Sequence, residues 1–220
     1  AERALRKALT AAGGNLTKKL VTLEALEEVF ESEGNYPAEE QVLLSSMRLM
    51  RSVDDIPGLL LAATYSKLAV VNFYMNRLDR AEYFCRIALP VLKDSAGSIS
   101  PDLAIALNNL GWIEYELKQY KHSESHLRQS LYILQRLFGD KDVLYGLTAN
   151  NLAKVYLSVG NYQAALLWYR RCSKAMHSSV GPGSPITGEI DLRCRQLQSL
   201  LGKNAYKQAR RPSATGARRQ

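Results

Sequence analysis

Apolar and polar positions alternate along the chain with the period of amphipathic helices, and this pattern itself recurs every 42 residues. Four segments align on one another without a gap: TLEALEEVFESEGNY at 22–36, TYSKLAVVNFYMNRL at 64–78, ALNNLGWIEYELKQY at 106–120 and TANNLAKVYLSVGNY at 148–162. Such a repeat predicts a stack of similar helical units rather than one undivided core.

Residue types in the aligned columns indicate how each unit is built. Leucine fills one column, and the next column holds mostly small residues, which let a second helix approach closely; the leucines are Leu26, Leu68, Leu110 and Leu152. A short turn follows at 34–36, 76–78, 118–120 and 160–162, where Gly or Asn suits a left-handed residue that ends a helix. Ser-Pro pairs at 100–101 and 184–185 predict helix starts. Each unit is therefore expected to be helix, turn, helix and loop.

This pattern resembles the tetratricopeptide repeat, in the 42-residue form of kinesin light chains. The resemblance rests on the ALNNL and TANNL openings, the Gly-Asn-Tyr and Lys-Gln-Tyr turns, and the loops LFGDKDV (137–143) and VGPGSPI (180–186). It implies an all-α solenoid of antiparallel helix pairs wound into a right-handed superhelix. The expected division is a half-repeat or N-terminal cap helix at 1–15, repeats at 18–60, 61–102, 103–144 and 145–186, a capping helix at 187–209 and a disordered basic tail at 210–220.

The resemblance also implies a function, which is the binding of a peptide or helix of another protein in a concave groove lined by the first helix of each unit. Carried over position by position, the expected groove residues are Ser66, Val70, Phe73, Tyr74, Asn108, Trp112, Tyr115, Asn150, Lys154 and Leu157. The equivalent positions of the first unit form an acidic end, with Glu24, Glu28 and Glu31.

The chemistry of these residues fits an extended ligand. An asparagine amide both donates and accepts hydrogen bonds, so Asn108 and Asn150 could bracket a peptide backbone while Trp112 and its aromatic neighbours bury an anchor. An alternative is that the aromatic rings pack between repeats and the asparagines tie helices together. The acidic end favours a basic ligand segment. A clamp for a terminal carboxylate is not expected, because only Lys154 could serve in it.

The net charge of +8 changes this picture at one end of the chain. Residues 1–60 carry −3, residues 61–163 carry +2 and residues 164–220 carry +9. An alternative function is therefore the binding of nucleic acid or membrane phosphates, although nucleic acid is the less expected partner. The basic patch would comprise Arg193, Arg195, Lys203, Lys207, Arg210 and Arg211. Self-association through the incomplete terminal repeats is a further alternative.

Other signals are weaker. No catalytic motif, cofactor site or membrane-spanning run is found, so we expect no enzyme and no cofactor. Three separated cysteines indicate buried thiols in a reducing compartment, the cytoplasm. His122 and His126 have the spacing of a metal-binding pair but lack a third ligand, which favours a solvated pair on the convex side and no metal. Pro90 predicts a kink within its helix, near residues 86–90.

Overall fold

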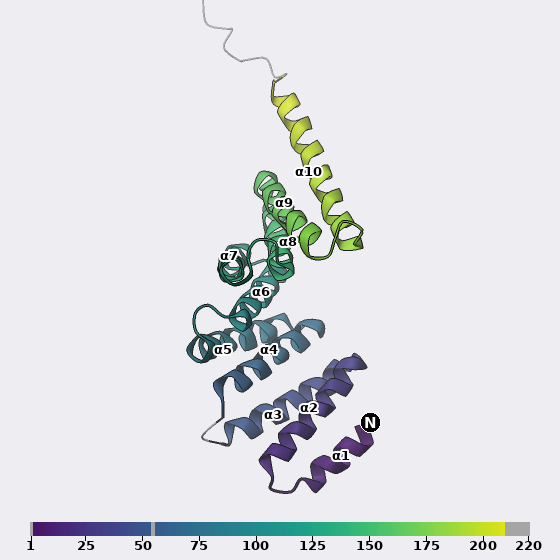
Figure 1. Ribbon diagram of the computed structural model, residues 1–220, viewed down its shortest axis with the longest axis vertical. Coiled ribbons are helices and arrows are strands. Elements are labelled where there is room, and N and C mark those ends of the chain that lie inside the picture. The colour runs from purple at the N-terminus through teal and green to yellow at the C-terminus, as the bar shows by residue number, and fades with distance from the viewer. Residues whose placement is uncertain (1, 54–55, 210–220) are drawn as a thin grey trace, which may run out of the picture. The chain divides into compact units, whose positions relative to one another are not determined.

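The computed structural model describes residues 2–53 and 56–209, with side chains up to Lys203, and every regular element in these ranges is an α-helix (Figure 1). The all-α prediction is confirmed. The helices, in chain order, are α1 (Glu2–Ala11), α2 (Leu16–Ser32), α3 (Tyr36–Arg51), α4 (Gly58–Tyr74), α5 (Leu78–Ala96), α6 (Pro101–Glu116), α7 (Tyr120–Phe138), α8 (Val143–Ser158), α9 (Tyr162–Ser179) and α10 (Pro185–Ala209).

The chain divides into two compact units, each of which is described by itself. Unit 1 is residues 1–137, with helices α1 to α7, and unit 2 is residues 138–220, with α8 to α10. Inside each unit, helices that follow one another in sequence pack side by side, such as α4 with α5 and α8 with α9. The expected repeat boundaries remain a proposal.

The turns inside the helix pairs share one backbone geometry at intervals of 42 residues. Gly34, Asn76, Lys118 and Gly160 have left-handed φ values of 64°, 57°, 61° and 75°. After each of them, the next backbone N–H donates to a carbonyl five residues earlier, at distances of 2.8–2.9 Å. This arrangement satisfies carbonyls at the helix end that would otherwise lack a donor. The predicted left-handed turn is confirmed, and Lys118 adopts it despite its side chain.

The column of leucines forms the core, and its small neighbours allow close helix packing. Leu26, Leu68, Leu110 and Leu152 are at most 2% exposed. A Cβ placed on Gly111 would lie 2.7 Å from the Leu127 side chain, so α6 and α7 are close enough there to exclude even a methyl group. Ser123 and Ser130 of α7 donate hydrogen bonds to carbonyls of α6 over 2.6 and 2.7 Å, which fixes the pair.

Charged residues connect neighbouring helix pairs in unit 1. Lys67 of α4 lies 2.7 Å from a carboxylate oxygen of the buried Glu27 of α2, and Arg77 and Arg80 lie 2.8 and 3.1 Å from the buried Glu40 of α3. Glu27 stands where the other repeats have Ala69, Gly111 and Ala153, whereas the position of Glu40 holds glutamate again at Glu82 and Glu124. Both buried carboxylates are stabilised by cations from the next pair, because a buried carboxylate without a partner is costly.

Two expectations about the chain's course have different outcomes. Ser100 caps α6 through a hydrogen bond from the Leu103 N–H, and α10 begins at Pro185, as the two Ser-Pro pairs predict. Helix α5 continues through Pro90, and the kink stays a prediction.

The expected disorder of 210–220 lies outside the described residues. Within the described residues, no helix is both long and apolar enough to cross a membrane.

Candidate peptide-binding surface

The expected groove positions of unit 1 lie on α2, α4 and α6, and we call them the first-helix surface. On α2, Glu24, Glu28 and Glu31 are all exposed. On α4, Ser66 and Phe73 are half-buried, while Val70 is 37% and Tyr74 is 60% exposed. On α6, Asn108, Trp112 and Tyr115 are half-buried. Every one of these side chains keeps some solvent-accessible area, as contact with a ligand requires.

Aromatic rings of the first-helix surface stack on tyrosines of the turns. The Tyr74 ring is stacked on Tyr36, at the start of α3, with centroids 5.0 Å apart and an interplanar angle of 8°, and it meets Phe73 edge-on at 5.9 Å. The alternative of ring packing between helix pairs is thus realised for Tyr74. Because the ring remains largely exposed, this packing holds it in place without covering it.

A second aromatic cluster lies on α6. The rings of Trp112 and Tyr115 are stacked at 4.9 Å and 19°, and Tyr115 contacts Tyr120 of α7 at 5.9 Å. Asn108, one helical turn before Trp112, donates a long hydrogen bond of 3.5 Å to the side chain of Asn109. The sequence prediction missed Tyr36 and Tyr120, although both stand at the same turn position in the 42-residue alignment.

In unit 2, the expected groove residues Asn150, Lys154 and Leu157 lie on α8 and are half-buried. Leu157 lines a small cavity of about 130 Å³ together with Tyr169 and residues of α10, among them Arg193 and Leu197. Helix α10 therefore lies close to the end of this row of positions. The amphipathic pattern of α10 predicts a covering helix but does not say which residues of α8 it approaches.

The residues of the predicted basic patch differ in their contacts. Arg193 forms an ion pair of 2.9 Å with Glu189, and this bond raises the pKa of Arg193 and lowers the pKa of Glu189. Arg195 and Lys203 are exposed. The side chains of Lys207, Arg210 and Arg211 lie outside the described residues. Arg193 is consequently less available to an external phosphate than its sequence position implies.

Behind the acidic end of the first-helix surface lies a buried carboxyl group. Glu39 of α3 is 5% exposed, and burial, followed by the charges of Glu31 and Glu27, raises its pKa from 4.5 to about 7. Its Oε2 atom has no hydrogen-bond partner among the described residues. The equivalent positions of later pairs hold Ala81, Ser123 and Ala165, so among these four positions an ionisable side chain occurs only in the first pair.

The expectation of a solvated histidine pair was wrong for His126. Its Nδ1 lies 2.7 Å from Glu114 Oε2, and the other oxygen of this fully buried carboxylate lies 3.1 Å from Arg86 of α5. The error arose because Glu114 is 12 residues from His126 in sequence and on another helix. His122 is exposed, with its ring 3.3 Å from the Gln119 amide oxygen.

The three cysteines are free and buried, as expected. Burial raises the pKa of both Cys85 and Cys172 to about 12, which keeps these thiols protonated and unreactive. No group of three or more potential metal ligands lies together within the part of the chain that the structure describes.

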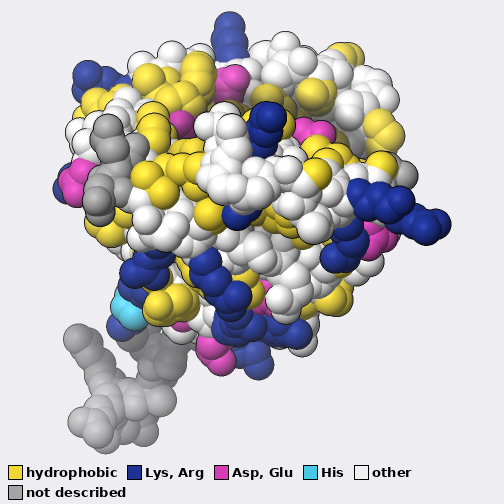
Figure 2. Space-filling model, turned by 90° about the horizontal axis from the view of Figure 1, so that it is seen from below, with side chains coloured by type: hydrophobic (Ala, Val, Ile, Leu, Met, Phe, Trp, Pro, Cys, Tyr) yellow, Lys and Arg dark blue, Asp and Glu magenta, His cyan; other side chains and the backbone are white. Residues whose placement is uncertain are grey.

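Exposed apolar side chains occur on several helices, as on most protein surfaces. Figure 2 shows hydrophobic side chains in several groups that polar and charged ones border on the face that it draws. At the N-terminus, Leu5 and Leu9 of α1 pack on the core cluster of Leu23, Leu26 and Phe30, although Val21 remains 59% exposed. Helix α1 therefore covers part of the apolar face on which the self-association alternative depends.

Comparison with known proteins gives the family and the fold. The chain resembles the crystal structure of BtubC (BKLC) from P. vanneervenii at 19% identity, with a TM-score of 0.78, over 99% of this chain and 92% of that one. It resembles a putative kinesin light chain with TPR-like repeats from Podospora anserina at 12% identity, with a TM-score of 0.71, over 87% of this chain and 90% of that one.

A third similar structure is the Rap conjugation gene regulator of plasmid pLS20, in complex with the Phr* peptide. It is 15% identical, with a TM-score of 0.64, and the alignment covers 86% of this chain and 51% of the regulator. No curated protein matches the chain. The tetratricopeptide repeat model matches residues 60–136 and 113–176, which together span more than half of the sequence. The chain belongs to the tetratricopeptide repeat family.

Proposed function

We propose that this chain is a non-enzymatic interaction module that binds a peptide or helical segment of a partner protein on its first helices. Tetratricopeptide repeat domains generally mediate protein–protein interactions, and the similar Rap regulator was solved with a bound peptide. At 15% identity this likeness shows the fold, and the residues of this chain's own first helices support the function.

The observation that supports the proposal best is the aromatic and amide arrangement on α6. Trp112 is stacked on Tyr115, and Asn108 lies one turn away on the same face, so an apolar anchor and a backbone-binding amide stand side by side. Tyr74 adds a largely exposed ring that Tyr36 already holds in place. Rings fixed before binding lose little conformational entropy when a ligand covers them.

The charges of α2 support a preference in the ligand. Glu24, Glu28 and Glu31 are exposed on successive turns, so a Lys- or Arg-containing segment would be attracted to this end. In unit 2, Asn150, Lys154 and Leu157 of α8 are the corresponding candidate ligand contacts. The buried thiols suit a reducing compartment, and we place the proposed function in the cytoplasm.

Selection from a random peptide display library tests the proposal, with Tyr74→Ala and Tyr83→Ala as a matched pair. Each tyrosine is 60% exposed, but Tyr74 lies on the first-helix surface and Tyr83 lies on α5. Selected peptides should share an apolar anchor and basic residues. Tyr74→Ala should weaken their binding about tenfold, as expected for an interface anchor, whereas Tyr83→Ala should leave it unchanged.

Two results would contradict the proposal. The first is a library that yields no binder, and the second is a set of binders that both variants affect equally. The alternative of phosphate binding by the basic patch makes a different prediction, because its affinity should fall steeply with salt and should not respond to Tyr74→Ala.

A further inference from the structure

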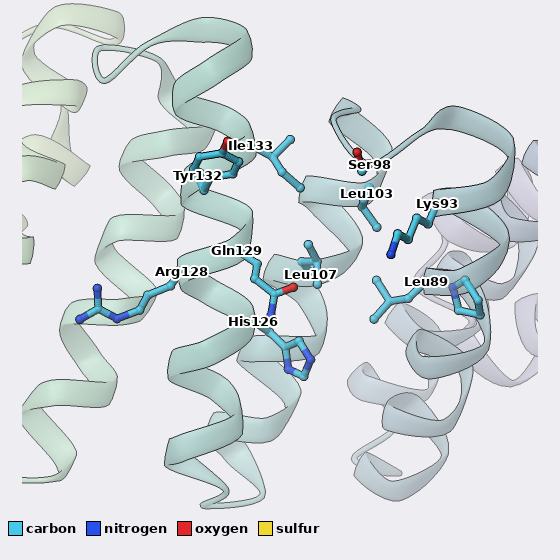
Figure 3. A pocket seen from close by; sticks show the side chains of 11 residues that line it. Leu89, Lys93, Ser98, Leu103, Leu107, His126, Arg128, Gln129, Tyr132 and Ile133 are labelled. Atoms are coloured by element: carbon cyan, nitrogen blue, oxygen red, sulfur yellow. The ribbon is translucent and has the colours of Figure 1, made fainter.

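Unit 1 contains a cavity that lies away from the first-helix surface. It has a volume of about 500 Å³ and lies between α5, α6 and α7 (Figure 3); we call it the α5–α7 cavity. Leu103 and Leu107 of α6, Leu89 of α5 and Ile133 of α7 contribute apolar walls. None of its lining residues belongs to the proposed peptide-binding surface. The function proposed above therefore leaves this cavity unexplained.

The polar lining is basic, and its charges differ in how far they are already satisfied. His126 is bound to the buried Glu114 at 2.7 Å. Arg128 lies 2.9 Å from Glu124, and its guanidinium extends away from the cavity in Figure 3. Lys93 has no acidic partner within 4.0 Å among the described residues, and Figure 3 shows its ammonium group directed across the opening towards α6.

We propose that the α5–α7 cavity binds a small anionic amphiphile, a molecule with an apolar chain or ring and one carboxylate that pairs with Lys93. A volume of about 500 Å³ falls within the usual range of small-molecule pockets. The leucine and isoleucine walls would take up the apolar part, whose removal from water drives binding. The ammonium group would form a charge-assisted hydrogen bond with the carboxylate.

Other ligand classes fit these walls less well. A cation would meet Lys93 and no carboxylate that lacks a partner, because Glu114 and Glu124 are already paired. A peptide backbone would need several hydrogen-bonding groups in line, whereas the walls that Leu89, Leu103, Leu107 and Ile133 form offer none. Gln129 and Ser98, at the edge of the cavity, can add one or two hydrogen bonds to a carboxylate head group.

The experiment compares three ten-carbon ligands by titration calorimetry below their aggregation concentrations, with the full chain. Decanoate should bind, 1-decanol should bind about tenfold more weakly, and decylammonium should bind most weakly of the three. Lys93→Gln should remove the preference for decanoate over decanol. Lys121→Gln, a change of another exposed lysine that does not line the cavity, should keep that preference.

A second variant and a second measurement locate the site. Leu89→Trp places a larger side chain in the wall from a half-buried position on α5, and it should abolish decanoate binding while circular dichroism shows an unchanged helix content. Methyl NMR of the wild-type chain should show shifts of Leu103, Leu107 and Ile133 when decanoate is added.

Three outcomes would overturn the inference. Decanoate that fails to bind at millimolar concentration is the first. Binding that Lys93→Gln and Leu89→Trp leave unchanged is the second. The third is an acidic leucine-containing peptide that shifts the cavity methyl signals when decanoate does not, since the site would then recognise a protein segment.

Discussion

Replacing Glu39 by glutamine should stabilise the protein at neutral and alkaline pH. The carboxyl group is 5% exposed between α2 and α3, it lies near the negative charges of Glu27 and Glu31, and one of its oxygens lacks a hydrogen-bond partner among the described residues. Ionisation at this position is therefore opposed both by the loss of hydration and by repulsion between like charges. Glutamine has nearly the same shape and no charge.

The size and sign of the effect follow from the pKa. Burial and the neighbouring carboxylates raise the pKa of Glu39 from 4.5 to about 7. The folded chain then binds more protons than the unfolded chain between these two values, so its stability falls as pH rises from about 4.5 to 7 and stays lowered above that. A rise of this size corresponds to roughly 3 kcal/mol, which is the upper limit of the gain from Glu39→Gln at pH 8. At pH 4.5 the wild type and the variant should have similar stability.

Urea unfolding of both chains at several pH values from 4.5 to 8 measures this difference, and amide hydrogen exchange in α2 and α3 reports it locally. Glu28→Gln, an exposed change on α2, is the control and should give a difference that hardly varies with pH. Glu39→Ala, which introduces the residue found at positions 81 and 165, should also stabilise at pH 8. A difference in unfolding free energy between Glu39→Gln and the wild type that does not change between pH 4.5 and 8 would refute this account of Glu39.

Three other substitutions test the packing of unit 1 by the same unfolding assay. Lys118→Gly should stabilise by about 1 kcal/mol, because Lys118 has a φ of 61° that glycine adopts without steric strain; an unchanged or lower stability would contradict this account of the turn. Glu114→Ala should destabilise by about 1.5–3 kcal/mol, since it removes the hydrogen bonds of a buried carboxylate to His126 and Arg86 while Arg86 keeps Glu82 as a partner, whereas Glu124→Ala, at a partly exposed pair, should cost less than about 1 kcal/mol. Gly111→Ala should destabilise by about 1–3 kcal/mol through a contact of 2.7 Å with a leucine of α7, and Gly188→Ala, with no atom within 4 Å of its added Cβ, should not.

Features that the 42-residue repeat contains could be predicted from the sequence. Leucine recurs in the column of Leu110 because every repeat needs the same buried side chain there. The left-handed conformation of Gly34 recurs at the equivalent positions, although the residue type changes, because every helix pair needs the same turn. These are local or nearest-neighbour requirements, and a periodic pattern records them directly. The candidate first-helix positions could be named for the same reason.

Features that occur in only one of the 42-residue repeats could not be predicted in this way. The column of Glu114 holds Phe30, Asn72 and Tyr156 elsewhere, so the alignment gives no reason to expect a buried carboxylate with His126 as its partner. Likewise, the approach of α10 to Leu157 depends on a helix outside the aligned repeats. Such contacts join residues of different helices, and their partners become known only when the helices are placed in space.

Helix α6 shows why the peptide-binding surface and the α5–α7 cavity can be tested separately. Asn108 and Trp112 are four residues apart, and so are Leu103 and Leu107, but the first pair follows the second by five residues, which places it about 140° further around the helix. Trp112 therefore belongs to one surface and Leu107 to the other, although both lie on the same element. A substitution at Lys93 on α5 changes only the cavity, and a substitution at Tyr74 on α4 changes only the first-helix surface. If either variant affected both kinds of ligand, the two sites would be coupled through α6, and by thermodynamic reciprocity each ligand would then alter the affinity of the other by the same factor.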